Sequence, residues 1–330
     1  VAKSPPRFEA PAARARRGPP FTWPEAIIEI REGPMLLTFR EAVERAGPLV
    51  ANVQTAGGQS GSGVVLDGSH LVTTAQVAGP EDQITVTLAS GRRSSGAVIG
   101  VDPVYLIALI HLETRIPFSP LPPFPRAAAG DLCLLLASPA PMERAVTMGV
   151  VTAPDLTVYR PDRIPVDGLL VTDATLPPGG AGGLLLSAGG EPLALAAMPW
   201  ANGLLLAIQM EVVQRVANQM LEYGSATHAW LGFSGQPEVV QEELRSLFGL
   251  PVDRGLVVNH VAPGGPGQKA GVRVFDMVVR AEGQPVSSVG ELRKILSRRR
   301  PGDRITITVL RAGELLDIEF PVEEMPVRRT

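Results

Sequence analysis

Short runs of β-branched and aliphatic residues alternate with glycine, proline, aspartate and serine between residues 49 and 207. Runs of this length and spacing are typical of antiparallel strands joined by tight turns, and so many of them indicate barrels or a sandwich. The 35 glycines and 32 prolines agree with a chain that turns often. The expected strands are residues 49–54, 62–66, 70–74, 84–89, 96–101, 107–112, 132–137, 147–152, 169–172 and 193–198.

A second unit with a different pattern follows this β-rich region. Residues 211–223 carry apolar side chains at helical spacing, and Gly224 is placed to end that helix. The polar link 225–229 then leads into an alternation of strands and helices that suits a small, partly open barrel capped by two helices. Its expected elements are strands at 230–234, 255–260, 276–282, 304–311 and 315–321, and helices at 237–248 and 289–299.

The length of 330 residues favours two domains with additional tails. Residues 1–24 are rich in proline, alanine and arginine, and they lack the apolar spacing needed to offset the entropy of ordering, so we expect a disordered arm. The expected division is an arm at 1–24, a lead-in at 25–48, a first domain at 49–224, a linker at 225–229, a second domain at 230–325 and a tail at 326–330.

Composition excludes several classes of function. The formal net charge of −3 argues against a nucleic-acid-binding protein, which should carry a clear basic excess. Cys133 is the single cysteine and lies in an apolar run, so it is interpreted as an inert core residue. No apolar run approaches the roughly 18 to 20 residues of a membrane span, and no His, Asp or Glu cluster has metal-ligand spacing. We therefore expect no membrane span, no metal and no cofactor.

Six segments of the first domain carry longer motifs in a fixed order. Together they resemble the HtrA-type (DegP-like) serine proteases, which implies a trypsin-like double six-stranded β-barrel and makes the expected fold class mostly β. The segments are 61–66 (GSGVVL), 71–77 (LVTTAQV), 84–92 (ITVTLASGR), 102–109 (DPVYLIAL), 130–139 (GDLCLLLASP) and 172–183 (TDATLPPGGAGG).

The same resemblance assigns the positions of the catalytic triad. The position of the imidazole is Gln76, that of the carboxylate is Leu106, and that of the nucleophile is Ala181. A serine protease needs a hydroxyl, a base and an orienting carboxylate, so the chain is predicted to be an inactive relative, a pseudoprotease. Gly179, Gly180 and Ala181 form a remnant of the oxyanion turn, for which a purely structural role in turning the chain is the favoured interpretation.

The second domain resembles the PDZ domains that follow such proteases. Residues 230–233 (WLGF) fit the carboxylate-binding loop, and residues 253–258, 268–272 and 301–311 fit later strands. The resemblance implies that protein or peptide C-termini are bound as an added strand. The implied binding residues are Trp230, Leu231, Gly232 and Phe233 in the loop, with Leu292, Ile295 and Leu296 lining a side-chain pocket; the alternative is that these apolar residues are only domain core. Phe275 occupies an unusual turn and is expected to be exposed, as a contact surface would be.

Three functions stay open from the sequence. The leading hypothesis is a non-catalytic scaffold or adaptor that binds through the PDZ domain, and its rivals are a structural subunit of a larger complex and a hydrolase with a relocated triad. For a relocated triad the candidates are His70, Ser187, Ser60 and Ser62. His70 is interpreted as a surface or loop histidine and the serines at 60 and 62 as turn residues, whereas Ser187 lies past the apolar strand 184–186, where the glycine turn no longer presents it.

Assembly and compartment are also open. Relatives form trimers through N-terminal segments, for which Phe21, Trp23 and Phe39 are candidate contacts. The family works mostly outside the cytoplasm, yet the chain shows no export signal. Val1 is interpreted as either an unusual start or a processed end, and these two origins imply different compartments.

Overall fold

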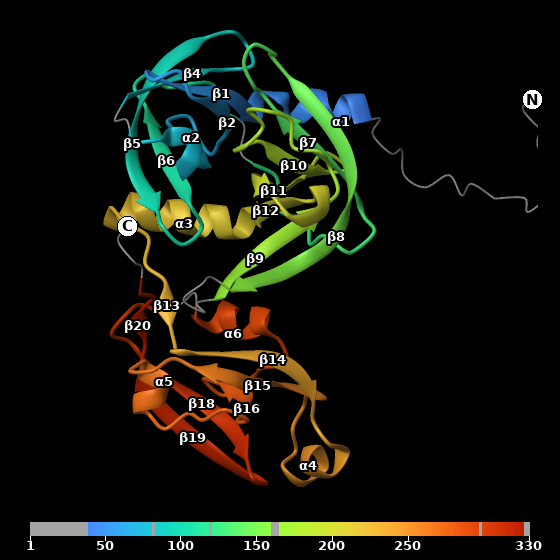
Figure 1. Ribbon diagram of the computed structural model, residues 1–330, viewed down its shortest axis with the longest axis vertical. Helices are drawn as coiled ribbons and strands as arrows, with labels where there is room; N and C mark the ends of the chain where they lie inside the picture. Colours follow the sequence, from blue (N-terminus) through green and yellow to red (C-terminus); the bar gives the residue numbers. More distant parts are fainter. Residues whose placement is uncertain (1–38, 81–82, 119–120, 160–164, 297–298, 327–330) are drawn as a thin grey trace, which may run out of the picture. The chain divides into compact units, whose positions relative to one another are not determined.

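Six antiparallel strands of the first domain close into a barrel (Figure 1). The computed structural model describes residues 39–80, 83–118, 121–159, 165–296 and 299–326, so the expected arm at 1–24, Phe21 and Trp23 lie outside the described residues. The hydrogen-bonded order is β1-β2-β3-β6-β5-β4, closed by pairing of β1 with β4. The strands are β1 (Val50–Thr55), β2 (Ser60–Val65), β3 (His70–Thr74), β4 (Gln83–Thr87), β5 (Arg93–Asp102) and β6 (Ile107–Leu112).

A second barrel has the same six-stranded form, with the order β10-β11-β12-β9-β8-β7. Its strand β10 is a continuous apolar run in which Leu184, Leu185 and Leu186 are all fully buried, as expected for a strand that is covered on both faces. The two closed barrels confirm the expected trypsin-like fold. The strands are β7 (Leu132–Ala137), β8 (Ala145–Tyr159), β9 (Pro165–Thr172), β10 (Leu184–Ser187), β11 (Pro192–Pro199) and β12 (Leu205–Gln209).

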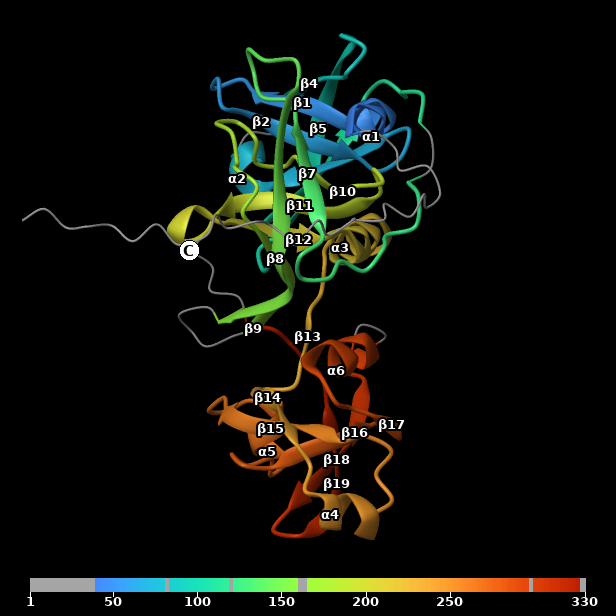
Figure 2. The ribbon, with the colours of Figure 1, turned by 90° about the vertical axis from the view of Figure 1, so that its right-hand side faces the viewer.

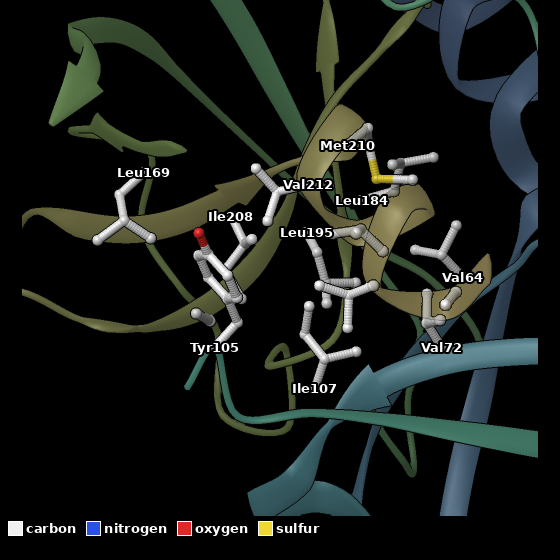
Figure 3. Close-up of a cluster of buried hydrophobic side chains, with 14 of the residues drawn as sticks. Val64, Val72, Tyr105, Ile107, Leu169, Leu184, Leu195, Ile208, Met210 and Val212 are labelled. Atoms are coloured by element: carbon white, nitrogen blue, oxygen red, sulfur yellow. The ribbon is translucent and has the colours of Figure 1, made fainter. Parts of the chain in front are cut away.

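One apolar core joins the two barrels and the helix that follows them (Figure 3). It contains Val64 and Val72 from the first barrel, Leu184 and Leu195 from the second, and Val212 from α3 (Met210–Tyr223). Helix α3 ends at Gly224, which adopts a φ of 76° and donates its N–H to Met220 O at 2.9 Å, the left-handed cap that favours glycine. The apolar stripe of α3 thus predicted its burial correctly.

The lead-in contributes a short helix, α1 (Phe39–Ala46), followed by a 3-10 turn, Gly47–Leu49. Ala42 and Ala46 are buried, whereas Phe39 is 41% exposed. Its exposure keeps Phe39 accessible for a contact between copies of the chain, although a trimer stays a prediction. None of the helices in the described part of the chain combines the length and apolarity that a membrane crossing needs.

The second domain is a sheet in the order β14-β15-β16-β18-β19, with β14 at one edge and helix α6 beside β14 (Figures 1 and 2). A separate pairing of β13 with β20 ties the start of the domain to its end. The elements are β13 (Ala229–Trp230), β14 (Phe233–Val239), α4 (Glu242–Leu247), β15 (Arg254–Val261), α5 (Pro266–Lys269), β16 (Met277–Ala281), β17 (Gln284–Pro285), α6 (Val289–Leu296), β18 (Arg304–Arg311), β19 (Glu314–Pro321) and β20 (Glu323–Glu324).

One element of this domain differs from the sequence-based expectation. A helix was expected over 237–248, but Pro237 and Val239 belong to β14 and the helix begins at Glu242. Proline lacks an N–H and is tolerated in an edge strand, and β14 is such a strand. Pro237 therefore lies within the strand rather than starting the helix.

The single cysteine is part of the core of the second barrel. Cys133 is fully buried on β7, and its Sγ lies 3.1 Å from the hydroxyl of Thr172. Burial raises the pKa of the thiol, which keeps it protonated. Cys133 accordingly lacks the exposure and the thiolate character of a nucleophile.

Candidate functional site

The position assigned to the catalytic imidazole lies on α2 (Ala75–Ala78), directly after β3. Thr74 caps this turn by accepting a hydrogen bond from Val77 N at 3.4 Å. Val77 is buried in the first barrel, whereas Gln76 is exposed. The local fold therefore presents the side chain of Gln76 at the surface, but an amide cannot take a proton near neutral pH.

The position assigned to the orienting carboxylate lies in the turn between β5 and β6. Asp102 Oδ2 accepts a hydrogen bond from Tyr105 N at 2.8 Å and shapes this turn, and Leu106 follows with a φ of 55° and a side chain that is 46% exposed. Leu106 O accepts a hydrogen bond from Ala75 N at 2.6 Å. This bond joins the turn to α2, so the segments that carry Leu106 and Gln76 are adjacent.

The position assigned to the nucleophile lies in the glycine turn before β10. Ala181 O accepts a hydrogen bond from Ser62 N at 2.8 Å, which joins the turn to the first barrel. Gly180 N donates to Pro177 O at 2.8 Å, so this N–H points back into the turn. Gly182 has a φ of 82°, and a Cβ there would lie 2.0 Å from Ser62 O. The structure brings together the segments that carry Gln76, Leu106 and Ala181. Glycine is needed at 182 because a side chain there would collide with the first barrel.

The side chains at these three positions are an amide, an isobutyl group and a methyl group. Acyl transfer by the serine mechanism needs a hydroxyl, a proton acceptor and a carboxylate. Gln76, Leu106 and Ala181 supply none of these groups. Within the described ranges, no set of three or more His, Cys, Asp or Glu side chains is arranged to hold a metal ion.

His70, the histidine considered for a relocated triad, belongs to a different cluster. Its Nδ1 lies 2.8 Å from Asp67 Oδ2, and its Nε2 lies 3.2 Å from Nδ1 of His111 on the neighbouring strand β6. Partial burial of Asp67 opposes the change, but hydrogen bonds from His70 and Ser69 outweigh it and lower the pKa of this carboxyl. The free end of His70 thus faces a second imidazole and not a serine hydroxyl.

The serines considered for a relocated triad also have structural partners. The hydroxyl of Ser187 contacts the carboxylate of Glu191 and accepts hydrogen bonds from the N–H groups of Gly189 and Glu191. Ser62 is fully buried, donates to Gly179 O at 3.2 Å and accepts from Ser138 N at 2.9 Å. Ser60 Oγ accepts from Asn52 Nδ2 at 3.1 Å. These contacts agree with the interpretation of Ser60 and Ser62 as turn residues, and they give Ser187 a carboxylate rather than an imidazole as its partner.

A buried histidine that sequence reasoning did not single out lies in the linker. His228 Nε2 is 2.5 Å from Asp102 Oδ1, and both side chains are almost completely buried. Asp102 begins the Asp-Pro motif, but only the tertiary structure places His228 against it, since the two are 126 positions apart. The pair anchors the linker to the end of β5.

The loop of the PDZ domain is positioned by backbone hydrogen bonds. Leu231 O accepts from Gly267 N at 2.8 Å and Gly232 O accepts from Ala262 N at 2.7 Å. Gly232 has a φ of 76°, and a Cβ there would lie 2.8 Å from the ring of Pro266. This close approach requires glycine and fixes the loop directly before β14.

A groove is lined in part by the edge strand β14 and helix α6 and in part by residues of the first domain. Five of the seven residues expected to bind a peptide line it, namely Trp230, Leu231, Phe233, Leu292 and Leu296. Ile295 instead faces the interior, where it is 7% exposed and belongs to the core of the domain. Leu231, Phe233 and Leu292 also contact that core, so the groove floor and the core are shared.

The turn that carries Phe275 lies at the surface of the PDZ domain. Phe275 has a φ of 73°, donates its N–H to Val258 O at 2.8 Å and is 85% exposed. The next residue, Asp276, accepts a hydrogen bond from Arg273 N at 2.7 Å and closes the turn. The expected exposure of Phe275 is confirmed.

Comparisons with known proteins give the same two domains. Residues 61–195 match the trypsin-like peptidase domain family and residues 229–322 match the PDZ domain family. A DegP-like protein of Halomonas elongata is 29% identical over 273 residues, covering 81% of this chain and 56% of that protein. This chain thus spans about half the length of the DegP-like relative.

Two further relatives match over most of their own length. The serine endoprotease DegS of Salmonella typhimurium is 26% identical, covering 88% of this chain and 86% of that protein. The solved structure of the HtrA-type protease AlgW with a tripeptide has a TM-score of 0.67 at 28% identity, covering 88% of this chain and 98% of that one. The chain belongs to the HtrA-type family, in which a trypsin-like peptidase domain is followed by a PDZ domain.

Proposed function

We propose that this chain is a non-catalytic HtrA-type protein that binds the C-termini of other polypeptides through its PDZ domain. The observation that carries the proposal is the edge position of β14 next to α6, with the loop 230–233 directly before the strand. An edge strand offers unpaired backbone groups to an added strand, and the apolar groove beside it can take alternate side chains.

The absence of catalysis is proposed from the chemistry of the three assigned positions. Gln76, Leu106 and Ala181 lack a base, a carboxylate and a nucleophile, and all three would have to be replaced to complete a triad. The two imidazole–carboxylate pairs, His70 with Asp67 and His228 with Asp102, contact no serine or threonine hydroxyl in the described residues. These contacts favour the binding function over a relocated triad.

A similar protein supports the binding proposal. The AlgW structure, which shares this fold, was solved with a tripeptide. Strand addition depends on backbone hydrogen bonds and apolar contacts and needs no ionisable catalyst. Loss of the triad would therefore leave this activity intact.

The full chain is expected to show no turnover of casein and no labelling by a serine-directed fluorophosphonate. The physical reason is that no activated hydroxyl is available, and trypsin under the same conditions provides the positive control. Turnover that persists through rigorous purification would contradict the proposal, and Ser187→Ala and Ser62→Ala variants would then locate the nucleophile.

A change in the groove is expected to weaken peptide binding by about ten-fold or more. Leu296→Arg places a charge in the apolar groove, where burial without a partner is costly. Binding of a C-terminal peptide library to the full chain would be measured by fluorescence polarisation. Leu247→Arg is the matched control, because Leu247 is 71% exposed on α4.

Two other outcomes would change the proposed function. Peptides with an amidated C-terminus are expected to bind more weakly, since the loop is proposed to hold a carboxylate. Equal binding of amidated and free peptides would contradict that role of the loop. A chain that ignores the whole library, yet is recovered from native lysate with fixed partners, would instead support the structural-subunit function.

A further inference from the structure

Two histidines face each other on adjacent strands of the first barrel. His70 on β3 and His111 on β6 are directly opposite in the strand register, and residues opposite each other in an antiparallel pair project from the same face of the sheet. His70 Nε2 lies 3.2 Å from His111 Nδ1, and the ring centroids are 5.1 Å apart. Spacing along the chain does not reveal this pair, because its members are 41 positions apart.

A carboxylate sets the orientation and the tautomer of the His70 ring. The two oxygens of Asp67 lie 3.0 and 2.8 Å from His70 Nδ1. Asp67 Oδ1 also accepts hydrogen bonds from the backbone N–H groups of Ser69 and His70, which hold the carboxylate in the turn before β3. Because Asp67 accepts the proton on Nδ1, the lone pair of the neutral ring is on Nε2, the atom that faces His111.

The pair is accessible from solvent. His111 is exposed, and the side chain of His70 is 19% exposed. On the other side of β6, the residue opposite His111 is Ala97 of β5, which is exposed and whose methyl group leaves room beside the imidazole. Water molecules can therefore reach the two ring nitrogens and complete the coordination of a bound ion.

The distance between the two nitrogens fits a shared metal ion. Zinc binds imidazole nitrogens at about 2.0–2.1 Å in a tetrahedral arrangement, which places two such nitrogens about 3.3 Å apart. The observed separation of 3.2 Å therefore requires little movement of either strand. A metal-bound histidine usually donates its other ring N–H to a carboxylate, which orients the ring and raises its basicity. The contact between His70 and Asp67 has this form.

Without a metal, the same two rings form an N–H···N hydrogen bond. In that bond His111 donates from Nδ1 to Nε2 of His70. Metal binding needs a lone pair on both facing nitrogens, so the proton of His111 has to move from Nδ1 to its Nε2 by exchange with water. Both rings stay neutral in this change, and no net proton is released.

We infer that His70 and His111 bind a divalent transition-metal ion such as Zn²⁺, with Asp67 orienting His70 and water completing the coordination. Imidazole ligands favour zinc, copper and nickel, whereas magnesium and calcium prefer oxygen ligands. Two imidazoles supply about half the ligands of a structural zinc site, so we expect a dissociation constant on the order of 10 µM. The site lies in the first barrel and does not depend on peptide binding by the PDZ domain.

The test titrates Zn²⁺ into the tag-free full chain by isothermal titration calorimetry, with Mg²⁺ as the control ion. One Zn²⁺ is expected to bind per chain, and Mg²⁺ should give no saturable heat. His111→Gln should abolish the binding, because a single imidazole remains. The matched control is His260→Gln, since His260 also lies on a strand but is opposite Ser234 instead of a second histidine.

A second variant tests the role of the carboxylate. Asp67→Asn should weaken Zn²⁺ binding by about ten-fold, because it removes the charge that orients His70 and raises its basicity. Co²⁺ provides an independent readout, since its visible absorption bands report nitrogen ligation, and they should appear in the wild-type chain and be absent in His111→Gln.

Three results would overturn the inference. They are equal Zn²⁺ affinity in the wild-type chain and in His111→Gln, Mg²⁺ binding as tight as that of Zn²⁺, and the absence of saturable Zn²⁺ binding, which would leave the pair as a hydrogen bond only. His111 is exposed, so His111→Gln should keep its fold, and circular dichroism checks this. If that variant does not fold, the affinity of Asp67→Asn decides the question.

Discussion

Replacing Gly182 by alanine is expected to lower the free energy of unfolding by about 3–5 kcal/mol. The backbone there has a φ of 82°, and the added Cβ would lie 2.0 Å from Ser62 O and 2.5 Å from Thr73 Oγ1. Both contacts are in the interior, where Thr73 donates to Ser62 O at 2.6 Å. Urea denaturation followed by circular dichroism measures the change.

The control for this variant separates the steric term from the backbone term. Gly58 has a similar φ of 84°, but a Cβ there meets nothing within 4 Å. Gly58→Ala should therefore cost about 1 kcal/mol. Equal losses in the two variants would show that the contact with Ser62 is not limiting. A much larger loss at Gly182 would support a structural reason for the glycine turn beside Ala181.

Replacing Asp276 by alanine is expected to destabilise the PDZ domain by about 3 kcal/mol. Asp276 is 1% exposed and accepts two hydrogen bonds from Arg311, at 2.6 Å to Oδ1 and 2.7 Å to Oδ2. It also accepts from Arg273 N, and the hydrogen bonds that Arg311 donates to Asp276 raise the pKa of the guanidinium. Removing the carboxylate leaves the guanidinium of Arg311 without its partner, although partial contact with water limits the cost.

An exposed ion pair in the same domain provides the comparison. Arg304 Nε lies 2.6 Å from Glu319 Oε1, and both side chains are more than half exposed. Glu319→Ala should leave the unfolding free energy nearly unchanged, because water screens an exposed ion pair. Thermal unfolding of the two variants in the same buffer checks both expectations. A loss for Asp276→Ala as small as that for Glu319→Ala would contradict the role given to the buried pair.

The sequence predicted most of the strands because they alternate or are bounded by turn residues. Strands 70–74, 107–112 and 132–137 begin and end where they were expected. Strand β12 (Leu205–Gln209) was missed, since its apolar residues 205–208 show no alternation and the strand leads directly into α3 without a turn residue. Pro237 was assigned to a helix because its position on an edge strand depends on pairing with β15.

The residues of the candidate site were also predicted only in part from the sequence. The motifs assigned Gln76, Leu106 and Ala181 and the loop 230–233. Each assignment was possible because the residues on both sides of the position match the corresponding family motif.

Ile295 lies in the core of the domain while Leu292 and Leu296 line the groove, a distinction that helical spacing does not make, since it indicates which residues are apolar but not which of them border an open groove. The contact of His70 with His111 was not predicted, because the two residues are 41 positions apart and share no motif.

The sequence by itself determined the family, the mostly β fold and the residue types at the three positions assigned to the triad, because these depend on residue identity and local spacing. Only the tertiary structure decided which neighbours those residues have. It joined Ala181 to Ser62, His228 to Asp102, and His70 to His111. Burial and charge compensation arise from contacts between distant segments, so they enter with the folded chain.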